Sequence, residues 1–153
     1  MGLDKQKIGV YTPIVECVCV CTCLRRAARA VTRAYDEAFR PTGYRATQVA
    51  ILSALAELGP VILSALAEET VTDRTTLTRN LRLLEKKRLI CFECGDDRRE
   101  RRVCMTRRGI QVLHATRPTW ARVQERVIHR IGRRRFERME ADLSVVVEAA
   151  KGG

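Results

Sequence analysis

The chain has 153 residues, of which 46% are hydrophobic and 31% charged, so length and composition indicate one globular domain and exclude a wholly disordered chain. Its formal net charge of +11 indicates a polyanionic partner, because an uncompensated charge of this size repels itself. Aromatic residues make up only 5% of the chain, so its core must be built mainly from Leu, Val, Ile and Ala, which favours helices.

The sequence offers no membrane or secretion signal. No stretch reaches the roughly 18 uncharged apolar residues that a membrane-spanning helix needs. The apolar run 14–24 contains Glu16, follows Pro13 and lacks a small-residue cleavage site, so it is a poor signal peptide. Gln6 stands where a myristoylation signal has Ser or Thr. We therefore expect a cytoplasmic protein without a membrane partner.

The N-terminal part is predicted to be a flexible arm followed by one long helix. Residues 1–13 show no hydrophobic period. From Cys17 onward apolar residues lie three or four positions apart, as on one face of a helix: Leu24, Ala28, Val31, Tyr35 and Ala38. Pro41 and Gly43 are expected to end this helix. A helix of more than 20 residues needs a long partner, and only the C-terminal helices match it in length.

The next two helices are short. Thr47 is predicted to be the N-cap of a helix over Gln48–Leu58, which Gly59 and Pro60 should end. A second short helix is predicted over Val61–Glu69.

A basic helix and a hairpin are predicted to follow. Thr72 and Asp73 are a helix-start signal, and the leucines that come next share one face: Leu77, Leu81 and Leu84. A short helix, a tight turn and a basic helix are typical of a helix-turn-helix. Two short apolar runs, 89–92 and 103–105, flank an arginine-rich turn and predict a two-stranded wing.

Two more helices are predicted after Gly109. The first has a stripe at helical spacing: Ile110, Leu113, Trp120, Val123, Val127 and Ile131. Pro118 should kink or divide this helix, and Gly132 should end it. The final helix, Arg133–Ala149, also has an apolar face: Phe136, Met139, Leu143, Val146 and Val147. The terminal helices have more apolar surface than a winged helix of roughly 60 residues can cover, which predicts a helical dimer interface. The alternative is packing within one chain.

The predicted fold class is mostly α (α+β): a winged helix-turn-helix with a two-stranded wing, plus N- and C-terminal dimerisation helices. The predicted segments are a flexible arm at 1–13, an N-terminal dimerisation helix at 14–43, the DNA-binding winged helix at 44–109 and C-terminal dimerisation helices at 110–150.

The predicted wing contains the motif Asp97-x-Arg99-x3-Val103-x-Met105-Thr106-x2-Gly109. Together with the order of elements, this motif resembles the MarR family of bacterial transcription regulators, whose pattern is D-x-R-x3-V-x-L-T-x2-G. Two further segments agree: Leu77-x2-Asn80-Leu81-x2-Leu84-Glu85, and Pro118-x-Trp120-x3-Gln124. The resemblance covers roughly residues 23–147. Val71 and Arg88 depart from it, since the family often has glycine there; a left-handed Arg88 would cost on the order of 1–2 kcal/mol.

The basic helix is the predicted DNA reader. Its hydroxylated and cationic residues are the candidate DNA contacts: Arg74, Thr75, Thr76, Thr78, Arg79 and Arg82. The resemblance implies base contacts from Thr75 and Arg79, and an arginine can donate two hydrogen bonds to guanine. The threonine hydroxyls near the helix N-terminus can bind phosphates.

The turn of the wing is the second predicted contact, made by Asp97, Arg98, Arg99 and Arg101. The resemblance implies that Arg99 enters the minor groove and that Asp97 orients the wing by pairing with an arginine. Arg98 and Arg101 are expected to contact the DNA backbone.

The chain has seven cysteines, an odd number that excludes complete intrachain pairing. Four of them alternate before and within the first helix: Cys17, Cys19, Cys21 and Cys23. On a helix, 17/21 and 19/23 would align in pairs. A structural zinc site is disfavoured, because C-x2-C occurs only once, at Cys91 and Cys94, and His114 and His129 are remote. The four cysteines are instead candidates for sensing a soft metal, arsenite or an oxidant; simple packing is the alternative.

The resemblance implies a homodimeric repressor that binds a pseudo-palindromic operator in double-stranded DNA. It also implies release by a small molecule held between the dimerisation helices and the winged helix. No catalytic residue, certain cofactor or defined metal site is predicted, and a thiol enzyme is disfavoured because no cysteine has a nearby His or carboxylate motif. A sequence-indifferent basic nucleic-acid-binding protein remains the alternative function.

Overall fold

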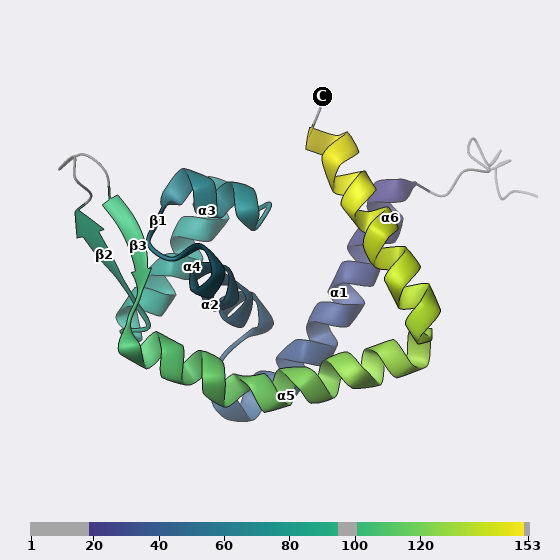
Figure 1. Cartoon of the computed structure of the whole chain (residues 1–153), viewed down its shortest axis with the longest axis horizontal. Coiled ribbons are helices and arrows are strands. Elements are labelled where there is room, and N and C mark those ends of the chain that lie inside the picture. The colour runs from purple at the N-terminus through teal and green to yellow at the C-terminus, as the bar shows by residue number, and fades with distance from the viewer. Residues whose placement is uncertain (1–18, 95–100, 152–153) are drawn as a thin grey trace, which may run out of the picture.

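The computed structural model describes residues 19–94 and 101–151. The elements follow in the order α1 (Val20–Phe39), the 3-10 helix η1 (Arg40–Thr42), α2 (Ala46–Leu58), β1 (Val61–Ile62), α3 (Leu63–Glu69), α4 (Arg74–Lys86), β2 (Ile90–Cys94), β3 (Arg101–Met105), α5 (Arg107–Ile131) and α6 (Arg133–Lys151). In Figure 1 the body formed by α2, α3, α4 and the strands lies on the left. Helix α5 runs from this body along the bottom of the view to α6. The predicted fold class is therefore confirmed.

The winged-helix body surrounds one leucine-rich core. Leu77, Leu81 and Leu84 of α4 are 0–1% exposed, as their spacing predicts. They pack with α2 leucines and with Leu66 of α3, which is also fully buried. Val103 of β3 completes the core from the sheet. The apolar face of α4 is thus fixed against three elements, so its opposite face must point outward.

The sheet has three antiparallel strands in the order β1-β3-β2. The hairpin of β2 and β3 is the predicted wing, with Ile90 opposite Met105. Strand β1 is a correction, because the sequence predicts a helix from Val61. Val61 and Ile62 instead pair with Val103 and Arg102, and α3 starts only at Leu63. Two β-branched residues after Gly59 and Pro60 are well suited to an extended edge strand, but their partner lies 40 residues away.

Helix α2 begins earlier than the sequence predicts, and Thr47 is not its N-cap. The helix starts at Ala46, whose N–H donates to the Asp36 carboxylate of α1 at 2.7 Å. The Gln48 side-chain oxygen accepts from the N–H of Arg45 at 3.2 Å. The start of α2 is therefore stabilised both by the local Gln48 side chain and by a carboxylate ten residues back on another helix.

Each of the two helices of the helix-turn-helix, α3 and α4, is followed by a left-handed residue that is not glycine. Val71 has φ 46° and Arg88 has φ 59°. The N–H of Thr72 donates to the Ala67 carbonyl at 2.9 Å, and the N–H of Leu89 donates to the Leu84 carbonyl at 3.0 Å. These bonds over five residues are Schellman motifs, which need a left-handed residue just after the helix. The chain keeps the turn geometry that glycine would allow, at the cost of backbone strain at two residues that have a Cβ.

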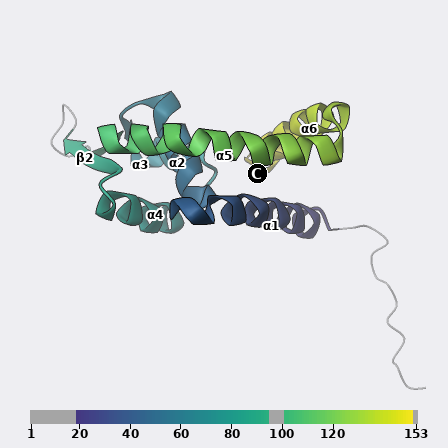
Figure 2. The same ribbon diagram turned by 90° about the horizontal axis from the view of Figure 1, so that it is seen from below.

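The long helix α1 packs against α5, as expected from their lengths. The two helices cross at an angle in Figure 1 and lie in neighbouring layers in Figure 2. The Tyr35 hydroxyl donates a hydrogen bond to the side-chain oxygen of Gln124, and partial burial raises the pKa of Tyr35. Helix α5 continues unbroken through Pro118, so the predicted division does not occur. It starts at Arg107, before the predicted Gly109, and ends at Gly132, which has φ 90°.

None of the helices in residues 19–94 and 101–151 is long and apolar enough to cross a bilayer.

Candidate nucleic-acid interface

Helix α4 presents a cationic face to solvent. Its N-cap is Asp73, as predicted: the carboxylate accepts from the Thr76 N–H at 2.8 Å, and this bond lowers the pKa of Asp73. Arg74, Arg79 and Arg82 are exposed, and none of the three forms a salt bridge within the described parts of the chain. Three guanidinium groups without a carboxylate partner on one helix face can each contact a phosphate or a base edge.

The threonines of α4 differ in how their hydroxyls are used. Thr75 is exposed and Thr76 is half-buried beside the cap. The Thr78 hydroxyl already donates to the Arg74 carbonyl at 2.7 Å, so its proton is directed into the helix. Among the predicted threonine contacts, Thr75 is therefore the best placed to reach DNA.

Of the four predicted wing contacts, Arg101 is described. It begins β3 and is exposed, and its guanidinium carbon lies 4.8 Å from the centroid of the Phe92 ring on β2. A guanidinium over an aromatic face is attracted by the ring and held in one position. Asp97, Arg98 and Arg99 lie outside the described residues, as does the predicted pairing of Asp97 with an arginine.

The wing joins α4 and α5 through Thr106 and Gly109, the last two residues of the wing motif. The Thr106 hydroxyl donates to the Arg88 carbonyl at 2.8 Å and accepts from the Gly109 N–H at 3.1 Å. Gly109 is buried, and a Cβ added there would lie 2.2 Å from the Leu89 carbonyl oxygen. Thr106 and Gly109 thus fix the geometry between α4, the wing and α5, a role that their spacing alone did not reveal.

The N-terminal cysteines are accessible. Cys19 is the N-cap residue of α1, Cys21 and Cys23 lie in its first turns, and all three are exposed. Hydrogen bonds from the Thr22 side chain and N–H lower the pKa of Cys19. Cys17 lies outside the described residues. Over the described ranges no group of three or more His, Cys, Asp or Glu side chains could hold a metal ion.

A cavity of about 760 Å³ lies between α2 and α5. Small residues of α2, including Ser53 and Ala54, line one side. His114, Arg117 and Trp120 of α5 line the other. The lining also includes the carboxylates of Glu57 and Glu69. An aromatic ring and charged groups of both signs beside small apolar residues suit a small organic molecule with polar groups.

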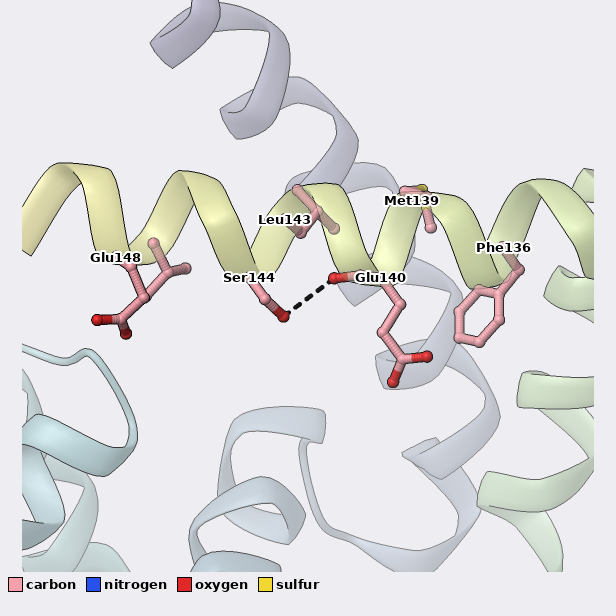
Figure 3. A pocket seen from close by; sticks show the side chains of 7 residues that line it. Phe136, Met139, Glu140, Leu143, Ser144 and Glu148 are labelled. Carbon is pink, nitrogen blue, oxygen red and sulfur yellow. Dashed lines mark hydrogen bonds between the residues drawn. The ribbon is translucent and has the colours of Figure 1, made fainter.

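Helix α6 presents a shallow apolar groove of about 430 Å³ (Figure 3). Phe136, Met139 and Leu143 line it together with Val147, and Met139, Leu143 and Val147 are 37–38% exposed. Glu140 and Glu148 lie at its edge. The apolar face predicted for this helix is present, but it remains open to solvent in the single chain.

Comparisons with known proteins agree with this geometry. Residues 42–100 match the model of the MarR family. The M. tuberculosis transcriptional regulator MosR, in a structure with DNA, is 35% identical; the similarity covers 88% of this chain and 97% of MosR, with a TM-score of 0.79. The chain belongs to the MarR family.

Other MarR-fold structures are similar at lower identity. S. aureus MepR, in a DNA complex, is 18% identical over 87% of this chain and 98% of its own, with a TM-score of 0.74. Bordetella bronchiseptica BpsR, whose DNA binding is regulated by 6-hydroxynicotinic acid, is 19% identical. The similarity covers 84% of this chain and 98% of BpsR, with a TM-score of 0.75. Comparison with curated proteins gave no match.

Proposed function

We propose that this MarR-family protein is a homodimeric transcription repressor that binds a pseudo-palindromic operator in double-stranded DNA. The observation that supports it most strongly is the face of α4. Arg74, Arg79 and Arg82 are exposed opposite leucines that are 0–1% exposed, so the helix has one fixed orientation and an outward cationic surface. MosR, at 35% identity, has been crystallised with DNA.

In the proposed complex, α4 lies in the major groove and the wing follows the adjacent minor groove. Thr75 and Arg79 contact base edges, since both are exposed and lie in the N-terminal half of the helix. Arg74, Arg82 and Arg101 neutralise phosphates. The remaining predicted contacts keep their assignments: Thr76 on a phosphate, Asp97 in orienting the wing, Arg98 on the backbone and Arg99 in the minor groove. Thr78 binds a phosphate only when its hydroxyl turns away from the Arg74 carbonyl.

The dimer is formed by the terminal helices. Burial of the open α6 groove against a second copy removes from water an apolar face that packing within the chain leaves half exposed. A two-fold dimer places two α4 helices on successive major grooves, which is why the operator should be a pseudo-palindrome.

Release follows from either of two signals. The cavity between α2 and α5 can bind a small organic effector, because Trp120 supplies a ring surface and Arg117 a cation. Alternatively, a soft metal, arsenite or an oxidant reacts with the N-terminal cysteines and changes the N-terminus of α1. These cysteines are Cys17, Cys19, Cys21 and Cys23. The lowered pKa of Cys19 favours its reactive thiolate.

The test begins with selection of bound duplexes from a random-sequence library, followed by binding measurements on the selected duplex. Arg79→Ala is expected to cost roughly 1–3 kcal/mol of binding free energy and to relax the preference at one base pair per half-site. Arg126→Ala is the matched control, because Arg126 is an exposed arginine of α5 outside the proposed interface.

Equal losses in Arg79→Ala and Arg126→Ala would contradict the assignment of α4. Equal affinity of the unaltered protein for the selected duplex and for random duplexes at one salt concentration would instead support sequence-indifferent nucleic-acid binding.

A further inference from the structure

Two cysteines of the wing face each other across neighbouring strands. Cys91 of β2 lies opposite Cys104 of β3 in the antiparallel register. The Cys91 thiol donates to the Cys104 carbonyl oxygen over 3.8 Å. Cys104 is 5% exposed, whereas Cys91 is only partly buried, so the pair has one thiol that reagents can reach and one that they cannot.

The register brings the two residues to the separation that a disulfide requires. The N–H of Thr106 donates to the Leu89 carbonyl at 3.0 Å, which extends the ladder by one hydrogen-bonded pair beyond Ile90. Hydrogen-bonded and non-hydrogen-bonded pairs alternate along antiparallel strands, so the pair of Cys91 and Cys104 is again hydrogen-bonded, with Cα atoms about 5.5 Å apart. Disulfides usually span Cα distances of about 4.4–6.8 Å.

The surroundings keep both thiols protonated. Burial, and next the Glu93 carboxylate, raise the pKa of Cys91; the same two causes raise that of Cys104 to about 11, slightly opposed by Arg102. The Cys91 thiol lies 3.8 Å from a Glu93 carboxylate oxygen. Strand β1, on the other side of β3, contributes only the uncharged Val61 and Ile62. Because the thiolate is the nucleophile, this pair reacts slowly at neutral pH and faster as pH rises.

We propose that Cys91 and Cys104 form a second thiol site, separate from the N-terminal cysteines, which low-molecular-weight disulfides oxidise to an intrachain disulfide. The Cys91 thiolate attacks one sulfur of the small disulfide, forms a mixed disulfide and releases one thiolate. The Cys104 thiolate then attacks the Cys91 sulfur, forms the protein disulfide and releases the second thiolate. Two electrons pass from the dithiol to the small disulfide, and the two protons that the cysteines lose end on the two released thiols.

This oxidation changes the strands that hold the wing. A disulfide brings two Cβ atoms to about 3.8 Å, whereas facing residues of paired strands have Cβ atoms about 4.5–5.5 Å apart. The ladder must therefore twist at this pair, and Arg101 over Phe92 lies nearby on the same hairpin. Oxidation is expected to weaken binding to the selected duplex, although the disulfide itself does not depend on the proposed DNA binding.

The experiment isolates the pair. A variant with serine at the other five cysteines retains only Cys91 and Cys104, and the substituted positions are Cys17, Cys19, Cys21, Cys23 and Cys94. It is incubated with glutathione disulfide, blocked and digested with trypsin without reduction. The expected product joins Leu89–Arg98 to Val103–Arg107, and its rate of formation should rise about tenfold per pH unit between pH 7 and 9. Glu93→Gln should speed the reaction at pH 7, because it removes the carboxylate that opposes thiolate formation.

Two controls make the result decisive. Cys104→Ser in the same background should give only the mixed disulfide at Cys91. The urea-unfolded variant should lose the effect of Glu93→Gln, because that effect needs the folded strands.

Mixed disulfides on both cysteines, or disulfide-linked dimers in place of the joined peptides, would overturn the proposal. So would an unchanged rate in Glu93→Gln. If the five-serine variant does not fold, the unaltered chain still yields the same joined peptides, with Cys94 free within its peptide. If oxidation leaves the affinity for the duplex unchanged, the proposed effect of the disulfide on DNA binding is wrong. The formation of the disulfide is tested separately, by the joined peptides.

Discussion

The winged-helix body and α6 contain apolar stripes of the same kind, but one stripe is buried within the chain and the other is partly exposed to solvent. Leu77, Leu81 and Leu84 of α4 are 0–1% exposed, because α2, α3 and the sheet surround them. Leu143 and Val147 of α6 are each 38% exposed in a groove that the single chain leaves open. A helical stripe therefore establishes that a partner is needed, whereas the tertiary arrangement decides whether the same chain supplies it.

The largest expected effect distinguishes these two regions directly. Leu81→Ala should lower the free energy of unfolding by about 2–5 kcal/mol, because it leaves a cavity in a fully buried core. Leu143→Ala should change the unfolding of the monomer little and instead shift the concentration at which the protein associates. Urea titrations and sedimentation over a range of concentrations measure the two effects. If both variants lose the same unfolding free energy and Leu143→Ala associates as the unaltered protein does, the apolar face of α6 is not an association surface.

A smaller effect is expected at the junction between the two regions. Thr106→Ala removes both the N-cap of α5 and the hydrogen bond to the Arg88 carbonyl, and should cost about 1–2 kcal/mol of unfolding free energy. Thr106→Ser keeps the hydroxyl and is the matched control. If thermal unfolding shows the two variants to be equally destabilised, the lost methyl group and not the hydrogen bonds accounts for the effect.

The smallest expected effect is a gain. Arg88→Gly should stabilise the winged-helix body by about 0.5–1 kcal/mol, because φ at this position is 59° and glycine adopts it without strain. Lys86→Gly, two residues earlier and still inside α4, should instead destabilise by about 1 kcal/mol. Opposite signs in urea titrations would support the strained cap, and a loss in both variants would speak against it.

Much of the candidate site follows from local rules. Asp73 caps α4 through an N–H three residues away, and the spacing of Leu77, Leu81 and Leu84 fixes which face is buried. The two apolar runs of the wing lie in or beside β2 and β3, and Gly132 ends α5. These features depend on residues close in sequence, so a single sequence contains the information for them.

Features made by distant residues were missed or misplaced. Strand β1 needs β3 as its partner, and the first turn of α2 needs the Asp36 carboxylate of α1. Neither partner lies within the segment that it organises, so local patterns predicted a helix at Val61 and a later start for α2. The role of Gly109 likewise became visible only beside the Leu89 carbonyl.

The sequence by itself determined the helical stripes, the cap at Asp73, the cationic face of α4 and the likeness to the MarR family, because each is a property of residue type and spacing. Only the tertiary structure decided that Val71 and Arg88 adopt left-handed backbones, that Cys91 faces Cys104, and that the groove of α6 stays open. Strand register and solvent exposure are set by where distant segments pack, and these contacts are not encoded in any one stretch of the chain. The left-handed residues belong to local turns, but residue type did not reveal them, because valine and arginine rarely adopt a left-handed backbone.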